Sequence, residues 1–435
     1  MSLYTYLFYT QTSIAQDRQS LERMLRFEAE LAQAQAACGI IPQQAADIIQ
    51  ACCRIEFLDI EKLKLEIRLG GNAAIPLVQQ LTRIVKNNDV EASRYVHVGA
   101  TSQDVIDTAT MLEIQEWMQW FDAKLNELAH VLFELTKQYR STIMMGRTLL
   151  QQAKPMTFGL KTATWLEAVL RSKRRMKGME ILGLQLQGAV GSGNSAIQKE
   201  VQQKMAQSLG LPLAHSWHSN RDNFAEWASF LGILSGSLGK MAKDISLLMQ
   251  TELGEVMEGA ADGKGGSSTM PHKRNPVTCA AILANATRSP ALVSTLLSAM
   301  PQEQERSAGL WHAEWETLTT LVELSAGSMD KTIDLMKGLE VNEERMLANV
   351  GMTHGLIFAE NVSLALTPAY GKLQAHELVE KACKQSIKQG KSLQEVLATM
   401  DLPIADLDRL FVPKNSIGNS LSTIDEILQS YENTL

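Results

Sequence analysis

The chain has 435 residues, of which 45% are hydrophobic, and it carries a formal net charge of −7 at pH 7. This length and composition indicate a globular protein with two or three core-forming units and exclude a disordered chain. The acidic balance argues against a surface for nucleic acid or an anionic membrane, since both require clustered Lys and Arg. We therefore expect no nucleic-acid or membrane partner, and an anionic ligand would need a local cationic pocket.

Cysteine usage and the start of the chain bear on its location. The five cysteines (38, 52, 53, 279 and 383) form no CxxC pair and no zinc-like spacing, which favours a reducing compartment. The opening MSLYTYLFYT lacks the basic residues and cleavage site of a secretory signal. We expect a cytoplasmic protein.

The hydrophobic pattern predicts an all-α fold in three helical domains. Residues 1–104 form the first domain and end in the turn HVGATSQD. Residues 105–352 form a central bundle of long helices, because Pro-free intervals are long and residues 107–139 repeat apolar positions every three or four residues. Small residues in SFLGILSGSLGKMA would let helices approach closely, and apolar faces beyond those that one bundle can cover predict an oligomer. Residues 353–435 form the third domain.

One segment rich in glycine, proline and hydroxyl residues, GGSSTMPHKRNP at 265–276, interrupts the helical pattern. It is not a phosphate-binding loop, because the upstream EGAADGKGG lacks the GxxxxGK spacing and no strand precedes it. A GxGxxG dinucleotide motif is also missing, so we expect no nucleotide cofactor. Two interpretations remain open on composition: a solvated surface loop, or a mobile loop that closes over a bound anion.

The same segment carries a family resemblance. GSSTMPHKRNP fits every fixed position of the GSSxMPxKxNP signature of the fumarase/aspartase superfamily. The segments HVGATSQDVIDTA (97–109) and GRTLLQQAKPMTFG (146–159) resemble two further motifs of that superfamily, in the same order. The resemblance covers nearly the whole chain. It implies a mostly helical, three-domain homotetramer with a 20-helix core, active sites built from three subunits, and no cofactor.

The resemblance also implies roles for particular residues. Ser267 would be the catalytic acid or base at the carbon alpha to a carboxylate, with Lys273 as its catalytic partner. A serine hydroxyl is weakly acidic, so a nearby cation must stabilise its alkoxide character. The expected substrate-binding residues from these motifs are Asn275, Ser268, Thr101, Ser102 and Gln103.

Departures from the superfamily pattern narrow the expected reaction. Most of its lyases read GRTH where this chain has Arg147-Thr148-Leu149, so the histidine that assists the leaving group is absent. An amine leaving group needs a proton as it departs, whereas intramolecular addition of a carboxylate does not. The chain therefore resembles the cycloisomerase branch, which closes a lactone on a carboxylated muconate.

Other departures agree with a small substrate that carries three carboxylates. Gly71-Asn72 replaces a histidine-aspartate pair of adenylosuccinate lyases, and Trp315 replaces an arginine that binds nucleotide phosphate there. Asn72, His97, Arg306 and Trp311 complete the predicted substrate contacts. Arg147 is expected to anchor its loop. Arg221 could balance an anion or pair with the surroundings of Asp222. The HSWH run with His215 and His218 lacks the ligands of a metal site. An adenylosuccinate-type lyase and a catalytically silent structural homologue are the alternatives.

Overall fold

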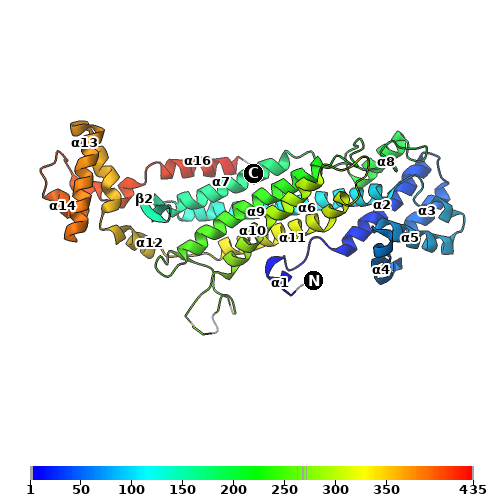
Figure 1. The fold of residues 1–435 in the computed structure, drawn as a ribbon, viewed down its shortest axis with the longest axis horizontal. Helices are drawn as coiled ribbons and strands as arrows, with labels where there is room; N and C mark the ends of the chain where they lie inside the picture. Colours follow the sequence, from blue (N-terminus) through cyan, green and yellow to red (C-terminus); the bar gives the residue numbers. More distant parts are fainter. Residues whose placement is uncertain (1–2, 262, 267–268, 271, 434–435) are drawn as a thin grey trace. The chain divides into compact units, whose positions relative to one another are not determined.

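The computed structural model describes residues 3–261, 263–266, 269–270 and 272–433. They fall into two compact units, each assembled from three stretches of chain. Unit 1 comprises residues up to 124, 175–236 and 284–329, and unit 2 comprises 125–174, 237–283 and 330 onwards. Helices dominate both units (Figure 1), which confirms the prediction of a mostly helical fold.

Unit 1 contains the N-terminal helices. They are α1 (Thr5–Phe8), α2 (Asp17–Ala37), α3 (Gln43–Cys52), η1 (Ile55–Phe57), α4 (Ile60–Gly70), α5 (Ala74–Asn88), η2 (Ala92–Tyr95) and α8 (Lys199–Leu209). Figure 1 shows α2, α3 and α5 side by side, and their buried faces include Phe27, Ile49 and Leu81, each at most 1% exposed. Apolar residues at helical spacing explain why these segments fold as helices and where their shared core lies.

Five long helices contribute residues to both units. They are α6 (Ser102–Gln138), α7 (Phe158–Lys177), α9 (Asp222–Leu248), α10 (Val277–Ala299) and α11 (Leu310–Lys337). In unit 1, α9 lies against α6 through the ring contact of Trp227 with Phe121, at 5.9 Å between centroids. It also lies against α10 at Gly232, where an added Cβ would stand 2.8 Å from Val293 Cγ2. The close helix approach predicted from the small residues of α9 is thus confirmed.

Unit 2 contains the remaining elements. They are β1 (Ile143–Thr148), β2 (Gln151–Thr157), β3 (Val256–Met257), β4 (Glu340–Val341), α12 (Glu343–Val350), η3 (Gly351–Thr353), η4 (Leu356–Phe358), α13 (Ala359–Gln389), α14 (Leu393–Ala398), α15 (Leu407–Leu410), η5 (Pro413–Ser416) and α16 (Ser420–Glu432). In this unit Thr136 of α6 donates to Thr162 of α7 at 2.9 Å. α13 changes direction at Gly371, whose φ of 71° favours glycine. A small core of Val362, Val379 and Val396 joins α13 to α14.

The four short strands were not anticipated from the sequence. β1 and β2 form an antiparallel hairpin in which Thr148 pairs with Gln151, so Leu149 and Leu150 form a two-residue turn. Both turn residues have positive φ, 51° and 66°, a backbone that matches the twist of paired strands but strains a leucine. A register shift between Gly146 and Arg147 breaks the alternation of the strand, which hides the hairpin from a pattern search.

No helix in the described part of the chain combines the length and the apolar character that crossing a bilayer requires.

Candidate active site

The TSQD segment is fixed by Asp104, a carboxylate with no exposed surface. Its Oδ2 accepts the backbone N–H of Thr101 at 3.0 Å and that of Gly188 at 2.9 Å, while Oδ1 accepts the N–H of Gln187 at 2.9 Å. The bond to Thr101 caps the start of α6, where backbone N–H groups lack helical partners. The bonds to Gln187 and Gly188 tie this helix start to the segment before α8. Asp104 therefore holds Thr101 and Ser102 in a fixed position at the helix start.

Arg306 lies against this segment. Its Nε donates to Gln103 Oε1 at 2.9 Å, and its Nη2 donates to Thr101 Oγ1 at 2.9 Å and to the carbonyl of Ala189 at 3.3 Å. The guanidinium also lies 5.9 Å from the ring centroid of Trp311. The structure thus brings together four predicted substrate-binding residues: Thr101, Gln103, Arg306 and Trp311.

The charge of Arg306 is not neutralised by these partners. All three acceptors are uncharged, and no carboxylate among the described residues forms an ion pair with it. Its Nη1 group has no recorded acceptor in the described part of the chain. A half-buried guanidinium with a spare donor edge is suited to binding a carboxylate, because such pairs are charge-assisted.

Arg221, Asp107 and Glu314 form a buried ionic cluster in unit 1. Arg221 donates from Nη1 to Asp107 Oδ2 at 2.7 Å and from Nη2 to Glu314 Oε2 at 2.5 Å, and all three residues are at most 3% exposed. Burial alone would lower the pKa of Arg221, but the two carboxylates outweigh it and raise that pKa. Burial raises the pKa of Glu314, although Arg221 opposes the shift. Arg221 therefore pairs with Asp107 of α6 and Glu314 of α11, and not with the surroundings of Asp222 that the sequence offered.

Gln103 and Trp311 connect this cluster to Arg306. The Gln103 amide donates to Asp107 Oδ2 at 3.0 Å and to the carbonyl of His218 at 2.9 Å. The Trp311 indole N–H donates to Asp107 Oδ1 at 3.1 Å. Gln103 is 0% and Trp311 2% exposed, so in this chain both are occupied in protein contacts, and their direct contact with substrate stays a prediction.

His97 forms a dyad with Glu28 of α2. Its Nδ1 lies 2.6 Å from Glu28 Oε1, and Glu28 is 1% exposed. Burial disfavours the imidazolium, but the Glu28 carboxylate outweighs burial and raises the pKa of His97. The backbone of His97 has φ of 61°, a strained value for a non-glycine residue. This combination of strain and a buried partner is typical of a functional position. Glu28 was not predicted from the sequence.

Asn72 and the two HSWH histidines take other places. Asn72 Oδ1 accepts the backbone N–H groups of Ala74 and Ile75 at 3.0 and 3.2 Å, so it caps α5, and no described contact joins it to Arg306. His218 is 3% exposed and its Nε2 lies 3.2 Å from Asp104 Oδ1. Among the described residues, no group of three or more His, Cys, Asp or Glu side chains is arranged to hold a metal ion.

The signature loop belongs to unit 2. Ser267 and Ser268 lie outside the described residues, Lys273 is exposed, and Asn275 is partly buried. The backbone N–H of Asn275 donates to the carbonyl of Gly265 at 2.9 Å and closes the loop stem. A Cβ on Gly265 would stand 2.7 Å from the Asn275 carbonyl, and its φ is 68°, so this glycine is required by the stem.

Arg274 anchors the same loop. Its guanidinium forms a two-pronged ion pair with Glu340 of β4, with both N–O distances at 2.9 Å. Glu258 accepts the backbone N–H of Cys279 at 2.8 Å and so caps α10 where the loop ends. These contacts hold Arg274, between Lys273 and Asn275, and the start of α10 in place.

Arg147 anchors the hairpin, as the sequence suggested. It pairs with Glu255 through Nη1–Oε2 at 2.9 Å and Nη2–Oε1 at 2.6 Å, and Glu255 is fully buried. Leu149, at the position of the missing lyase histidine, is 97% exposed at the hairpin tip. The side chain at this position offers no proton to a leaving group.

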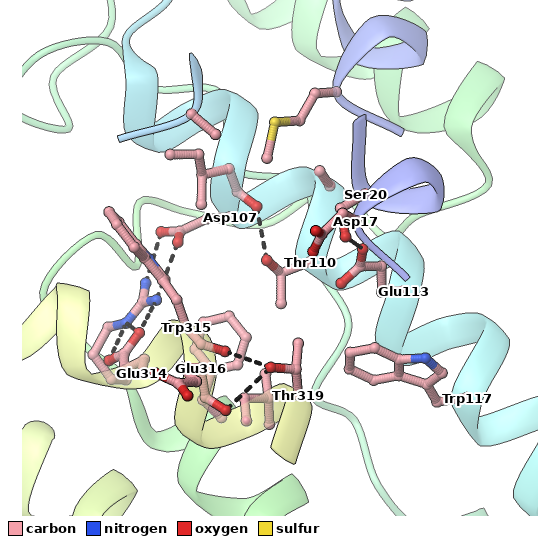
Figure 2. A pocket seen from close by; sticks show the side chains of 17 residues that line it. Asp17, Ser20, Asp107, Thr110, Glu113, Trp117, Glu314, Trp315, Glu316 and Thr319 are labelled. Atoms are coloured by element: carbon pink, nitrogen blue, oxygen red, sulfur yellow. Dashed lines mark hydrogen bonds and ion pairs between the residues drawn. The ribbon is translucent and has the colours of Figure 1, made fainter. Parts of the chain in front are cut away.

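A cavity of about 340 Å³ lies in unit 1 beside the ionic cluster. Figure 2 shows Asp17, Ser20 and Glu113 on one side of it and Asp107 and Glu314 on the other. Its lining includes five carboxylates and a single cation, Arg221, which already pairs with two of them. An anionic substrate would be repelled here, so the edge of Arg306, and not this cavity, is the candidate carboxylate site.

The matches to known families agree with this fold and this site. Residues 4–289 match the family described as lyase, and residues 355–427 match the adenylosuccinate lyase C-terminus family. The chain belongs to the lyase family, in the fumarase/aspartase superfamily that its signature loop predicted.

Individual relatives are similar over nearly the full length. The chain is 45% identical to 3-carboxy-cis,cis-muconate cycloisomerase of Acinetobacter baylyi, over 98% of each protein. It is also 45% identical to the enzyme of that name from Pseudomonas aeruginosa, over 96% of this chain and 94% of that protein. The crystal structure of 3-carboxy-cis,cis-muconate lactonizing enzyme from Pseudomonas putida matches with a TM-score of 0.94 at 41% identity, covering 99% of both chains.

Proposed function

We propose that this protein is a cofactor-free cycloisomerase that converts 3-carboxy-cis,cis-muconate to 4-carboxymuconolactone in protocatechuate (β-ketoadipate) catabolism. The relatives support the substrate, because they carry this activity in their names at 45% identity over nearly the whole chain. The structural observation that carries the proposal is the uncompensated guanidinium of Arg306 beside Thr101, which suits a polycarboxylate.

The reaction needs one new C–O bond and one proton. An ionised carboxylate of the substrate attacks the diene intramolecularly, the adjacent carboxylate takes up charge as an aci-carboxylate, and the carbon alpha to it is then protonated. The substrate supplies its own nucleophile, so the enzyme mainly holds a bent conformer and stabilises the developing charge. No group departs, which agrees with a leucine where lyases carry a histidine.

We assign the roles by the family resemblance together with the contacts above. Ser267 delivers the proton, and Lys273 and Asn275 bind the carboxylate that becomes the aci-carboxylate. Arg306, held by Thr101 and Gln103 at the start of α6, binds a second carboxylate, and Ser102 is a further predicted substrate contact. His97, held by Glu28 at 2.6 Å, is a further predicted substrate contact.

We propose further that the protein is a cytoplasmic homotetramer whose active sites combine residues of several subunits. Apolar side chains on the long helices support association: Ile233 of α9 is 49% and Leu297 of α10 is 47% exposed in the single chain. All five cysteines are free, in keeping with a reducing compartment. Light scattering would detect the tetramer, and a monodisperse monomer would contradict it.

The three predicted domains, 1–104, 105–352 and 353–435, are retained as a proposal, and the separate family match from 355 to 427 supports the last boundary.

The decisive experiment is an ultraviolet assay. Lactone formation destroys the conjugated diene, so absorbance of 3-carboxy-cis,cis-muconate should fall rapidly with purified protein, with or without a chelator. No change with this substrate, followed by cleavage of adenylosuccinate, would establish the lyase alternative. No turnover and no binding of any polycarboxylate by an intact oligomer would favour a silent structural homologue.

A further inference from the structure

We infer that Asp107 is a positioning residue for Arg306 and acts on it through two separate arms, the Gln103 amide and the Trp311 indole. This inference rests on the proposed function, in which Arg306 binds a substrate carboxylate. Asp107 is 1% exposed and both of its carboxylate oxygens are bonded to protein groups, so we assign it no substrate contact.

The first arm fixes the orientation of an amide. A glutamine amide can be turned by 180° with little change in shape, so only its partners decide which end faces Arg306. Asp107 Oδ2 and the carbonyl of His218 both accept from Gln103 Nε2, at 3.0 and 2.9 Å. The amide oxygen must then face Arg306 Nε, which donates to it at 2.9 Å.

The second arm fixes an aromatic ring. Asp107 Oδ1 accepts the indole N–H of Trp311 at 3.1 Å, and the ring centroid of Trp311 lies 5.9 Å from the Arg306 guanidinium carbon. A cation near a ring face is held by the electron density of the ring. Each oxygen of the Asp107 carboxylate therefore bonds to a neighbour of the Arg306 guanidinium. Oδ2 bonds to the Gln103 amide, which accepts from Arg306, and Oδ1 bonds to the Trp311 indole, whose ring lies beside the guanidinium.

Asp107 is itself held in one orientation. Arg221 donates to both of its oxygens, at 2.7 and 3.1 Å, so each oxygen receives two donors, one from Arg221 and one from an arm. An asparagine offers only one acceptor oxygen, and its amide group would face one of these donor pairs. The substitution Asp107→Asn therefore breaks an arm without removing side-chain volume.

Glu314 is the matched control. It is also a buried carboxylate on Arg221, at 3% exposure, but its other recorded side-chain partner is Gln302 and it has no arm to Arg306. If the cluster served stability alone, Asp107→Asn and Glu314→Gln should have similar effects on turnover. If Asp107 positions Arg306, the effect of Asp107→Asn on turnover should depend on the presence of Arg306, and the effect of Glu314→Gln should not.

The test is a double-mutant cycle on KM and kcat in the ultraviolet assay. We expect Asp107→Asn to lower kcat/KM about tenfold, mainly by raising KM, and to have less than about a twofold effect in an Arg306→Gln background. Glu314→Gln should have the same effect in both backgrounds. Trp311→Phe keeps a ring but removes the indole N–H; it provides a milder variant if Asp107→Asn does not fold, and its effect should also vanish without Arg306.

The possible failures are distinguishable. Absence of turnover by the unmodified protein would overturn the proposed function together with this inference. Turnover that Arg306→Gln does not impair would remove Arg306 from substrate binding. Turnover that depends on Arg306, with effects of Asp107→Asn or Trp311→Phe that are equal in both backgrounds, would overturn the positioning role alone.

Discussion

Replacing Arg306 by lysine tests whether the geometry of this cation matters beyond its charge. The guanidinium uses Nε and Nη2 on Gln103, Thr101 and Ala189, which leaves Nη1 for a ligand. A lysine ammonium is a single point of charge and cannot hold the scaffold and the substrate with separate edges. The variant Arg306→Lys should therefore lose the equivalent of one hydrogen bond to a charged group.

Such a bond contributes about 1.5–3 kcal/mol, so kcat/KM should fall by roughly 10- to 150-fold, chiefly through KM. The assay is the loss of diene absorbance over a range of substrate concentrations. Arg140→Lys is a suitable control, because Arg140 is partly exposed and already pairs with Asp425 at 2.7 Å; it should stay within about twofold of the unmodified protein. If Arg306→Lys also stays within that range, the assignment of Arg306 as a carboxylate ligand is wrong.

Two further predictions concern stability. Gly159→Ala should destabilise the protein by about 1–3 kcal/mol in thermal or urea unfolding, because the added Cβ would stand 2.6 Å from the Arg140 Cα. Gly236→Ala in α9 is the control: its added Cβ would meet nothing within 4 Å, so the free energy of unfolding should stay the same or rise. Equal effects of the two variants would refute the steric argument. Burial raises the pKa of Glu113 to about 7, so its folded form binds more protons than the unfolded form between about pH 4.5 and 7, and stability falls as pH rises through that window. Glu113→Gln should therefore gain stability relative to the unmodified protein between pH 5 and 8, by up to about 3 kcal/mol, whereas a pH-independent difference would show that Glu113 does not titrate there.

The sequence predicted the features that repeat along the chain. Apolar spacing predicted the long helices, and α6 indeed runs for 37 residues. The signature loop predicted the family, which the comparisons confirm. Both signals are local, since each lies within one stretch of sequence and needs no knowledge of which segments meet.

The parts that escaped prediction depend on contacts between distant segments. Asp107 and Glu314 lie in α6 and α11, and only folding places both on Arg221. Glu28, 69 residues before His97, is likewise invisible as its partner. The spacing of Gln103 and Asp107, four residues apart on one helix, was the single available sign of the positioning network.

The hairpin tip has a consequence for how such enzymes diversify. Leu149 occupies the position where related lyases carry a histidine, and its side chain is almost entirely solvent-exposed within the chain. Exchanging this side chain for histidine removes few packed atoms, and histidine is among the residues that tolerate the positive φ of this turn. The group that would supply a proton to a leaving group can therefore be gained or lost in a single mutational step, while the buried cluster around Arg221 stays unchanged.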